Sequence, residues 1–249
     1  MALVEFLCRM GDNTLVLGHR VSEWCGQAPV LEEDIALANV ALDLIGQTQM
    51  WLGLAAEVEG LGRSADDLAM LRDVWDFRNV LLVEQPNGDF GQTLIRQFLF
   101  DQWHVAMLGA LAGSGDPRVA EIAAKAVKEV RYHAERSADL VERLGDGTGE
   151  SHRRMQAALD RLWPYVGELF ADDAVDEAMA EAQVAPLPSS LRDRVMAEVE
   201  AVLARATLTV PDGAFAQGGG KTGARHSEHL GHMLTNMQWL QRAYPGARW

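Results

Sequence analysis

Residues 128–136 read KEVRYHAER. Glu129 and His133 are four positions apart, so on a helix their side chains lie on one face, about one turn apart. This spacing is close to the Glu-x-x-His pair with which some helical bundles hold two iron atoms. The stretch therefore makes a helical bundle built around a metal site the first hypothesis for the fold.

The spacing of apolar residues predicts helices along nearly the whole chain. Asp89 followed by Gln92, and Asp116 followed by Pro117, are typical helix starts, and Gly145 can supply the left-handed residue that ends a helix. The predicted long helices span about 3–24, 31–59, 90–112 and 117–144.

These four helices form two predicted hairpins joined by a long connection. The connection holds a short helix near 64–71, opened by Ser64 with Asp67 three residues later, and the irregular segment RNVLLVEQPNGDF. Two hairpins with one long crossover are the topology of ferritin-like four-helix bundles. Shorter helices are expected at about 151–162, 173–182, 190–206 and 227–242.

We therefore expect an all-α, ferritin-like four-helix bundle with additional C-terminal helices. The chain is expected to form a single domain over 1–249, with the core bundle at about 3–144 and accessory helices and a tail at about 145–249.

The second predicted helix has an apolar stripe with polar residues embedded in it. Its members fall at steps of three and four: Ile35, Asn39, Leu42, Ile45, Gln49 and Leu52. Asp43 to Gly46 lie deep in this part of the helix, where a bundle of this type would carry one of its Glu-x-x-His pairs.

A carboxylate-bridged di-iron site needs a carboxylate from each of two helices and a Glu-x-x-His pair from each of the other two. On the second helix the best match is Asp43 with Gly46, which has no side chain to bind a metal. On the fourth helix the pair would be Glu129 with Tyr132, and His133 lies one residue later, rotated by about 100° around the helix axis.

The other two helices do not supply the missing metal ligands. Asp12 or Asn13 is the candidate on the first helix, and Asp101 on the third, with His104 three residues later. These residues do not sort into the required pattern. We interpret Asp43, Gly46, Asp101, Glu129, Tyr132 and His133 as vestigial positions of a lost metal site, and we assign no catalytic, cofactor-binding or metal-binding residue to this chain.

Two further motifs carry weaker signals. GGGKT at 218–222 lacks the upstream glycine and the preceding strand of a phosphate-binding loop, so a flexible or partner-ordered loop is expected there. HSEHLGHM at 226–233 gathers His226, His229 and His232, but with one carboxylate it makes a poor closed metal site.

Composition excludes several classes of function. The net charge of -14 disfavours binding to nucleic acids and to anionic lipid surfaces. No apolar stretch is long enough for a membrane span, and the start lacks a secretory signal, so a cytoplasmic protein is expected. Cys8 and Cys25 lack the spacing of a redox pair and are expected to be buried thiols.

Five stretches together resemble one family. They are LGHRVSEWCGQAP, LEEDIALANVALDLIGQ, LLVEQPNGDFGQTLIRQFLFDQWHVAML, AKAVKEVRYHAERS and HSEHLGHMLTNMQWLQRAYPG. The chain is similar over its whole length to the C subunits of bacterial ring 1,2-phenylacetyl-CoA epoxidase complexes, and the LVEQPNGDF segment is highly specific.

The resemblance implies a non-catalytic structural subunit with a degenerate di-iron site and no cofactor of its own. It implies a catalytic A subunit, which is a ferritin-like paralogue that binds the di-iron centre, together with a small B subunit. It also implies a reductase that carries FAD and an iron-sulfur cluster and uses NADPH. Such a complex epoxidises phenylacetyl-CoA in aerobic phenylacetate breakdown.

Two alternatives stay open. The chain could itself be an active di-metal carboxylate oxygenase with a displaced ligand set that includes Glu129 and His133. It could also be a ferritin-like scaffold or binding protein outside any oxygenase. The metal content of the purified chain distinguishes an active di-metal oxygenase from the non-catalytic subunit. Co-purification with a paralogous di-iron subunit distinguishes the non-catalytic subunit from a scaffold outside any oxygenase.

Overall fold

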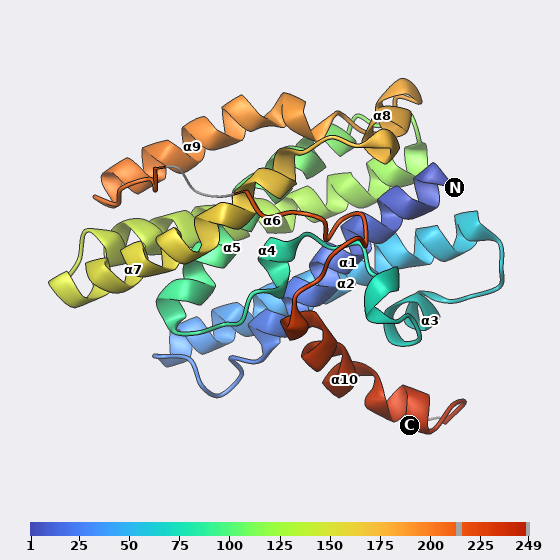
Figure 1. Cartoon of the computed structure of the whole chain (residues 1–249), viewed down its shortest axis with the longest axis horizontal. Coiled ribbons are helices and arrows are strands. Elements are labelled where there is room, and N and C mark those ends of the chain that lie inside the picture. The colour runs from blue at the N-terminus through green and yellow to red at the C-terminus, as the bar shows by residue number, and fades with distance from the viewer. Residues whose placement is uncertain (213–215, 248–249) are drawn as a thin grey trace.

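Four long helices form the centre of the molecule in the computed structural model, which describes residues 1–212 and 216–247. They are α1 (Ala2–Ser22), α2 (Leu31–Glu59), α5 (Phe90–Leu111) and α6 (Pro117–Gly145). α1 packs along α2 and α5 along α6, so the two hairpins lie as predicted (Figure 1). The predicted ranges differ from the observed ones by at most two residues, at the end of α1.

The helix starts follow from the residues that cap them. The Asp89 side chain accepts a hydrogen bond from the backbone N–H of Gln92, and Ser64 forms a capping box with Asp67. Asp116 accepts from the N–H of Arg118 at the start of α6. These side chains satisfy backbone donors that have no partner within the helix, which fixes where each helix begins.

Gly145 ends α6 for a reason other than the predicted one. It is the last residue of the helix and is not among the glycines with positive φ, so the expectation of a left-handed residue there is wrong. A Cβ at Gly145 would lie 2.5 Å from the carbonyl oxygen of Ala206. Glycine is needed because the backbone that follows α9 (Arg192–Arg205) passes directly against it.

The crossover between the hairpins runs along α1. It contains α3 (Ala65–Met70), the 3-10 turn η1 (Val74–Asp76) and α4 (Leu81–Glu84). The buried carboxylate of Asp12 is paired with Arg72 and accepts from the N–H of Arg78 at 2.8 Å. Asn13 accepts from the N–H of Val80 at 2.8 Å, so polar residues of α1 hold the crossover in place.

The C-terminal part adds a second set of helical elements. They are α7 (Gly149–Leu162), η2 (Trp163–Phe170), α8 (Ala174–Glu181), η3 (Pro188–Leu191), α9 (Arg192–Arg205) and α10 (Glu228–Ala243). α7 and α9 pack on α5 and α6, whereas α10 contacts α3 and η1 and projects from the body of the molecule (Figure 1). None of the described helices is both long enough and apolar enough to cross a membrane.

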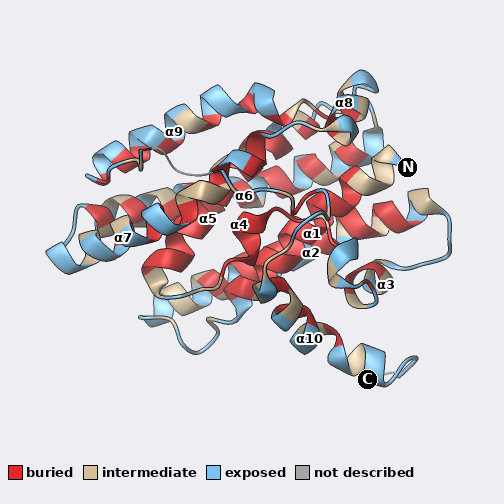
Figure 2. Ribbon diagram, in the orientation of Figure 1, coloured by how far each residue is buried: buried red, intermediate tan, exposed pale blue. Residues whose placement is uncertain are grey.

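The buried residues form one apolar cluster that runs from α1 to α10. Figure 2 shows it concentrated in α1, α4 and α5, while the outer sides of α7 and α9 are exposed. Trp51, Phe98 and Phe100 are among its largest fully buried side chains. Cys8 belongs to it, but Cys25 is exposed, so the expectation of two buried thiols is correct only for Cys8.

The predicted apolar stripe of α2 lies mostly on the outside of the molecule. Ile35 is 55% exposed and Leu42 is 68% exposed, and Asn39 and Gln49 are exposed beside them. Of the stripe, only Leu52 is fully buried. The inward face of α2 is instead made by Leu37, Val40, Leu44, Gln47, Thr48 and Trp51. The helix is apolar on both faces, so periodicity alone could not say which face is buried.

α1 and α2 approach each other closely over their middle turns. A Cβ at Gly11 would lie 2.5 Å from Cδ2 of Leu52, which is itself fully buried. The hydroxyl groups of Thr14 and Thr48 are hydrogen-bonded across the same contact, 2.9 Å apart. This contact requires a small residue at position 11 because the neighbouring side chain is enclosed by the core.

We predict that Gly11→Ala lowers the free energy of unfolding by about 1–3 kcal/mol, because Leu52 must move within a packed core. Gly53→Ala on α2 is the matched control, since a Cβ there meets nothing within 4 Å. The control is expected to raise stability by about 0.5–1 kcal/mol through helix propensity. Urea unfolding of both variants measures the difference, and equal effects in the two variants would contradict the close approach.

Candidate functional site

The vestigial positions of α6 do not face a common point. Tyr132 is 56% exposed and points away from the interior. Glu129 is half-buried and accepts a hydrogen bond from the side-chain amide of Gln47 at 3.3 Å. His133 is buried, and its Nε2 lies 2.9 Å from Oδ2 of Asp43. Glu129 and His133 therefore each make a polar contact with α2.

Gly46 is not an interior position. It is exposed, and a Cβ built on it meets nothing within 4 Å. A histidine at this position would begin on the outer face of α2, so the assignment of Gly46 as a lost metal ligand is wrong. Gln47, one residue later, is the buried side chain that reaches α6.

Asp101 on α5 is fully buried and is held by hydrogen bonds from neutral side chains. Its carboxylate accepts from Nε2 of Gln97 at 2.7 Å and from the hydroxyl of Ser137 at 3.0 Å. Burial raises the pKa of Asp101 to about 6, although nearby His133 and the two hydrogen bonds act in the opposite direction. With this pKa the carboxyl group is mostly ionised at pH 7 and takes up a proton as the pH falls through about 6.

His104, one turn after Asp101, is also fully buried. Its ring lies against Phe100 and Trp103, with ring centroids 5.0 and 6.1 Å away. Burial, together with the nearby His133, lowers the pKa of His104 to about 3. Among the described residues neither ring nitrogen has a hydrogen-bond partner, so His104 is a neutral ring inside an apolar and aromatic environment.

These side chains do not fit a di-iron centre. The described residues contain no group of three or more His, Cys, Asp or Glu side chains placed to hold a metal ion. Each candidate carboxylate is already bound by another partner, and the two α1 candidates, Asp12 and Asn13, serve the crossover. Bridged iron requires six ligands on four helices, and residues 1–212 and 216–247 do not place such a set together.

One histidine of the C-terminal motif, His226, contacts a different carboxylate. Glu84, at the end of α4, is fully buried; its Oε1 lies 2.5 Å from Nδ1 of His226 and accepts from Asn79 at 2.9 Å. Its Oε2 accepts from both the backbone N–H and the hydroxyl of Ser227. His232 is exposed. His226 therefore contacts a carboxylate of its own chain.

The glycine-rich loop encloses a second buried carboxylate. Glu168 accepts from the N–H groups of Gly219 and Lys221, at 2.9 and 3.1 Å, and from that of Leu81 at 2.7 Å. The Lys221 side chain is buried against Asp176. The described part of the loop is therefore ordered by the chain's own residues, and the expectation of a flexible loop is wrong there.

The sequence contained a signal for these carboxylates that its interpretation did not use. Glu84 is the only charged residue in the run VLLVEQP, and Glu168 lies in VGELF. A single acid within an apolar run is expected to be buried and therefore to need several donors. Glu84 meets donors 142 and 143 residues later in the chain.

All 249 residues match the family described as phenylacetic acid catabolic protein. The chain belongs to this family. It is also 50% identical over 247 residues to the C subunit of the 1,2-phenylacetyl-CoA epoxidase of Escherichia coli strain K12, and the match covers 99% of both chains. The resemblance inferred from the sequence is confirmed, as is the ferritin-like, all-helical fold.

The raised pKa of the buried Asp101 carboxyl group can be tested directly through the pH dependence of stability. Its pKa is raised from 3.8 to about 6 in the folded state, so the folded protein binds the proton more tightly than the unfolded chain. The stabilisation from this proton is complete below about pH 4 and is lost as the pH rises through 6. The full effect is about 3 kcal/mol.

We predict that Asp101→Asn removes this pH dependence. The amide that replaces the carboxyl group stays neutral, and Gln97 can flip to accept from it through Oε1, which has no described partner. The variant should gain stability relative to the wild type by about 3 kcal/mol between pH 4 and pH 7. Urea unfolding at several pH values measures this gain, and parallel profiles for the two proteins would contradict the raised pKa.

Proposed function

We propose that this chain is a non-catalytic structural subunit of a multicomponent di-iron oxygenase that epoxidises phenylacetyl-CoA. Its role is to support a catalytic A subunit that is a paralogue of the same fold. The observation that carries the proposal is the exposed apolar face of α2, in a chain half identical to an epoxidase C subunit.

The face of α2 has the composition of an interface. Leu31 at 71% and Ile45 at 39% exposure extend the row formed by Ile35 and Leu42. The exposed ring of Tyr132 on α6 adds an aromatic side chain from the neighbouring helix. Apolar surface gathered on one side of a rigid helix marks a protein contact, whereas scattered exposed apolar residues do not.

The shape and charge of this face favour a helical partner. Gly46 and Gly53 lie on the same side of α2 and leave space beyond the backbone, which allows a second helix to approach closely. α2 has six acidic residues and no Lys or Arg, with acids near both ends, such as Glu32 and Glu57. The partner face is therefore expected to be apolar in the middle and basic at its ends.

The absence of a catalytic role is supported by the donor geometry. His133 is paired with Asp43, and Asp101 is held by neutral donors. In the proposed assembly the di-iron centre belongs to the A subunit. The assembly also includes a small B subunit and a reductase whose FAD and iron-sulfur cluster transfer electrons from NADPH. A cytoplasmic location is part of the same proposal.

Iron content tests the proposal against an active di-metal enzyme. We predict that the isolated chain holds far less than one iron, whereas the chain purified with its catalytic partner yields about two irons per pair. Elemental analysis of both preparations measures this. About two irons in the isolated chain would overturn the proposal and would make Glu129 and His133 the residues to mutate.

Assembly with the A subunit tests the α2 face. Leu42→Asp places a charge in the middle of the apolar row, and we predict a loss of affinity of tenfold or more, since about 1.4 kcal/mol is tenfold. Because Leu42 is 68% exposed, the isolated variant should fold normally. The matched control is Ala204→Asp on the exposed side of α9.

Binding is measured by titrating each variant into the purified A subunit and by gel filtration of the mixture. Wild-type affinity for Leu42→Asp, or an equal loss for the Ala204→Asp control, would count against this face. Failure to bind any paralogous di-iron subunit would favour the alternative of a scaffold outside an oxygenase.

A further inference from the structure

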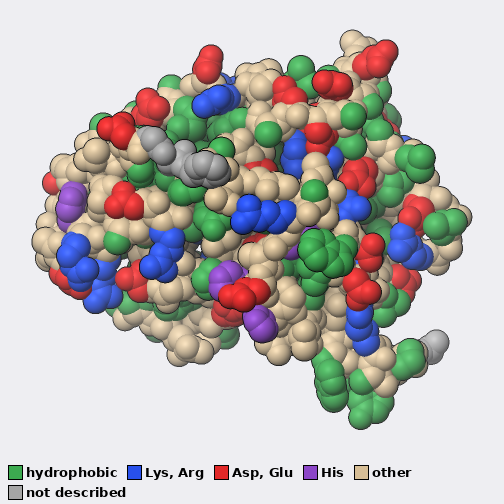
Figure 3. Space-filling model, viewed as in Figure 1, with side chains coloured by type: hydrophobic (Ala, Val, Ile, Leu, Met, Phe, Trp, Pro, Cys, Tyr) green, Lys and Arg blue, Asp and Glu red, His purple; other side chains and the backbone are tan. Residues whose placement is uncertain are grey.

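α10 forms an arm that ends in exposed aromatic residues. Trp239 is 60% exposed and Tyr244 is 57% exposed, and their rings meet edge to face with centroids 6.2 Å apart. Figure 3 shows hydrophobic side chains gathered on this projecting part of the molecule. The two rings add little to the core, and α10 contacts only α3 and η1 extensively.

The base of the arm is firmly fixed. Ser227, directly before α10, is bound through its N–H and hydroxyl to the buried carboxylate of Glu84. Arg20 of α1 donates at 3.1 Å to the carbonyl oxygen of His229 in the first turn and also donates to that of Glu84. The side chain of Gln238 donates to the carbonyl oxygens of Ala69 and Arg72. The arm is therefore held in place before any partner arrives, which lowers the entropy cost of binding.

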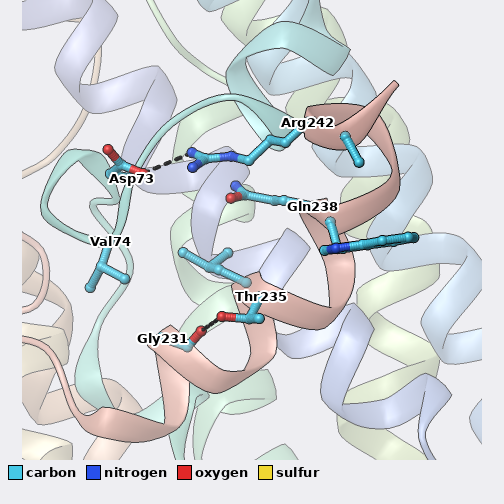
Figure 4. A pocket seen from close by; sticks show the side chains of 9 residues that line it. Asp73, Val74, Gly231, Thr235, Gln238 and Arg242 are labelled. Atoms are coloured by element: carbon cyan, nitrogen blue, oxygen red, sulfur yellow. Dashed lines mark hydrogen bonds and ion pairs between the residues drawn. The ribbon is translucent and has the colours of Figure 1, made fainter. Parts of the chain in front are cut away.

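A groove of about 440 Å³ lies between α10 and the segment around η1. Figure 4 shows side chains of α10 on one side and Asp73 and Val74 on the other. Trp239, Leu234 and Val74 give the groove an apolar surface. A second hollow of about 330 Å³ lies between α3 and the end of the arm, and Tyr244 and Leu71 line it.

Acidic side chains line both hollows. Asp73 lines the first, and Asp66 and Asp67 line the second. Arg242 is the one basic residue among the described residues that line them, and it is bound to Asp73 at 2.8 Å and to the carbonyl oxygens that follow α3. Asp73 stays 75% exposed, so its carboxylate can accept further donors.

We propose that this groove binds a basic amphipathic segment of another chain of the oxygenase complex. An apolar anchor of that segment lies against Trp239, Leu234 and Val74. Its Lys or Arg side chains pair with Asp73 at the groove and with Asp66 in the second hollow at the end of α10. These acidic side chains on a chain of net charge -14 favour a basic partner and oppose acidic peptides, nucleic acids and anionic lipids. The choice of a complex component rests on the proposed function, but the groove is separate from the α2 face.

The test uses the full chain and three purified components from the same source: the A subunit, the small subunit and the reductase. Each labelled component is titrated with the wild type, Trp239→Ser and Asp66→Lys. The matched control is Glu121→Lys, an exposed charge reversal on α6 outside the groove. Thermal unfolding checks that every variant is folded.

The expected result is that one component loses about tenfold or more in affinity with both groove variants and keeps its affinity with Glu121→Lys. Its binding to the wild type should also weaken between about 0.05 and about 0.3 M salt, because exposed charges are screened. If all three components bind both groove variants like the wild type, or if binding does not depend on salt, the inference is wrong. If Leu42→Asp weakens binding of the A subunit while neither groove variant weakens binding of any component, the proposed function stands and this inference is wrong.

Discussion

The carboxylate of Glu84 is the constraint on which the arrangement of the chain depends. It is fully buried, and a buried charge without partners costs several kcal/mol. Its donors come from Asn79 beside it and from His226 and Ser227 near the other end of the chain, while Arg20 of α1 binds its backbone carbonyl. α4 can be buried only if the first helix, the crossover and the C-terminal segment come together.

Glu168 is a second buried carboxylate whose donors come from distant parts of the chain. It takes N–H donors from the crossover at Leu81 and from the glycine-rich loop at Gly219 and Lys221. Gly220 is needed because a Cβ there would lie 2.5 Å from the carbonyl oxygen of Asn79. The loop looks in sequence like an anion-binding loop, and it does bind an anion, but that anion is a side chain of the same protein.

The sequence was sufficient to predict where the helices lie along the chain, but not which face of a helix is buried. Helix starts at Asp89 and Asp116 could be predicted because a cap depends on neighbouring residues only. The orientation of α2 could not be predicted, because both of its faces are apolar and tertiary packing decides which of them is buried. For that reason the sequence pattern suggests an interior place for Gly46, whereas Gln47 is the residue that faces α6. The contacts of Glu84 with His226 and Ser227 could not be predicted either, because these residues lie 142 and 143 positions later in the chain.

The uncovered face of α2 also bears on the order in which such a complex is made. Its apolar residues are not required for folding, because the core beneath them is complete without them. At the same time the net charge of -14 makes copies of the chain repel one another, which keeps a finished monomer dispersed while that face is open to water. Under the proposed function, a chain whose core is complete without the α2 face can fold before it meets its partner, so its synthesis need not be timed to that of the rest of the assembly.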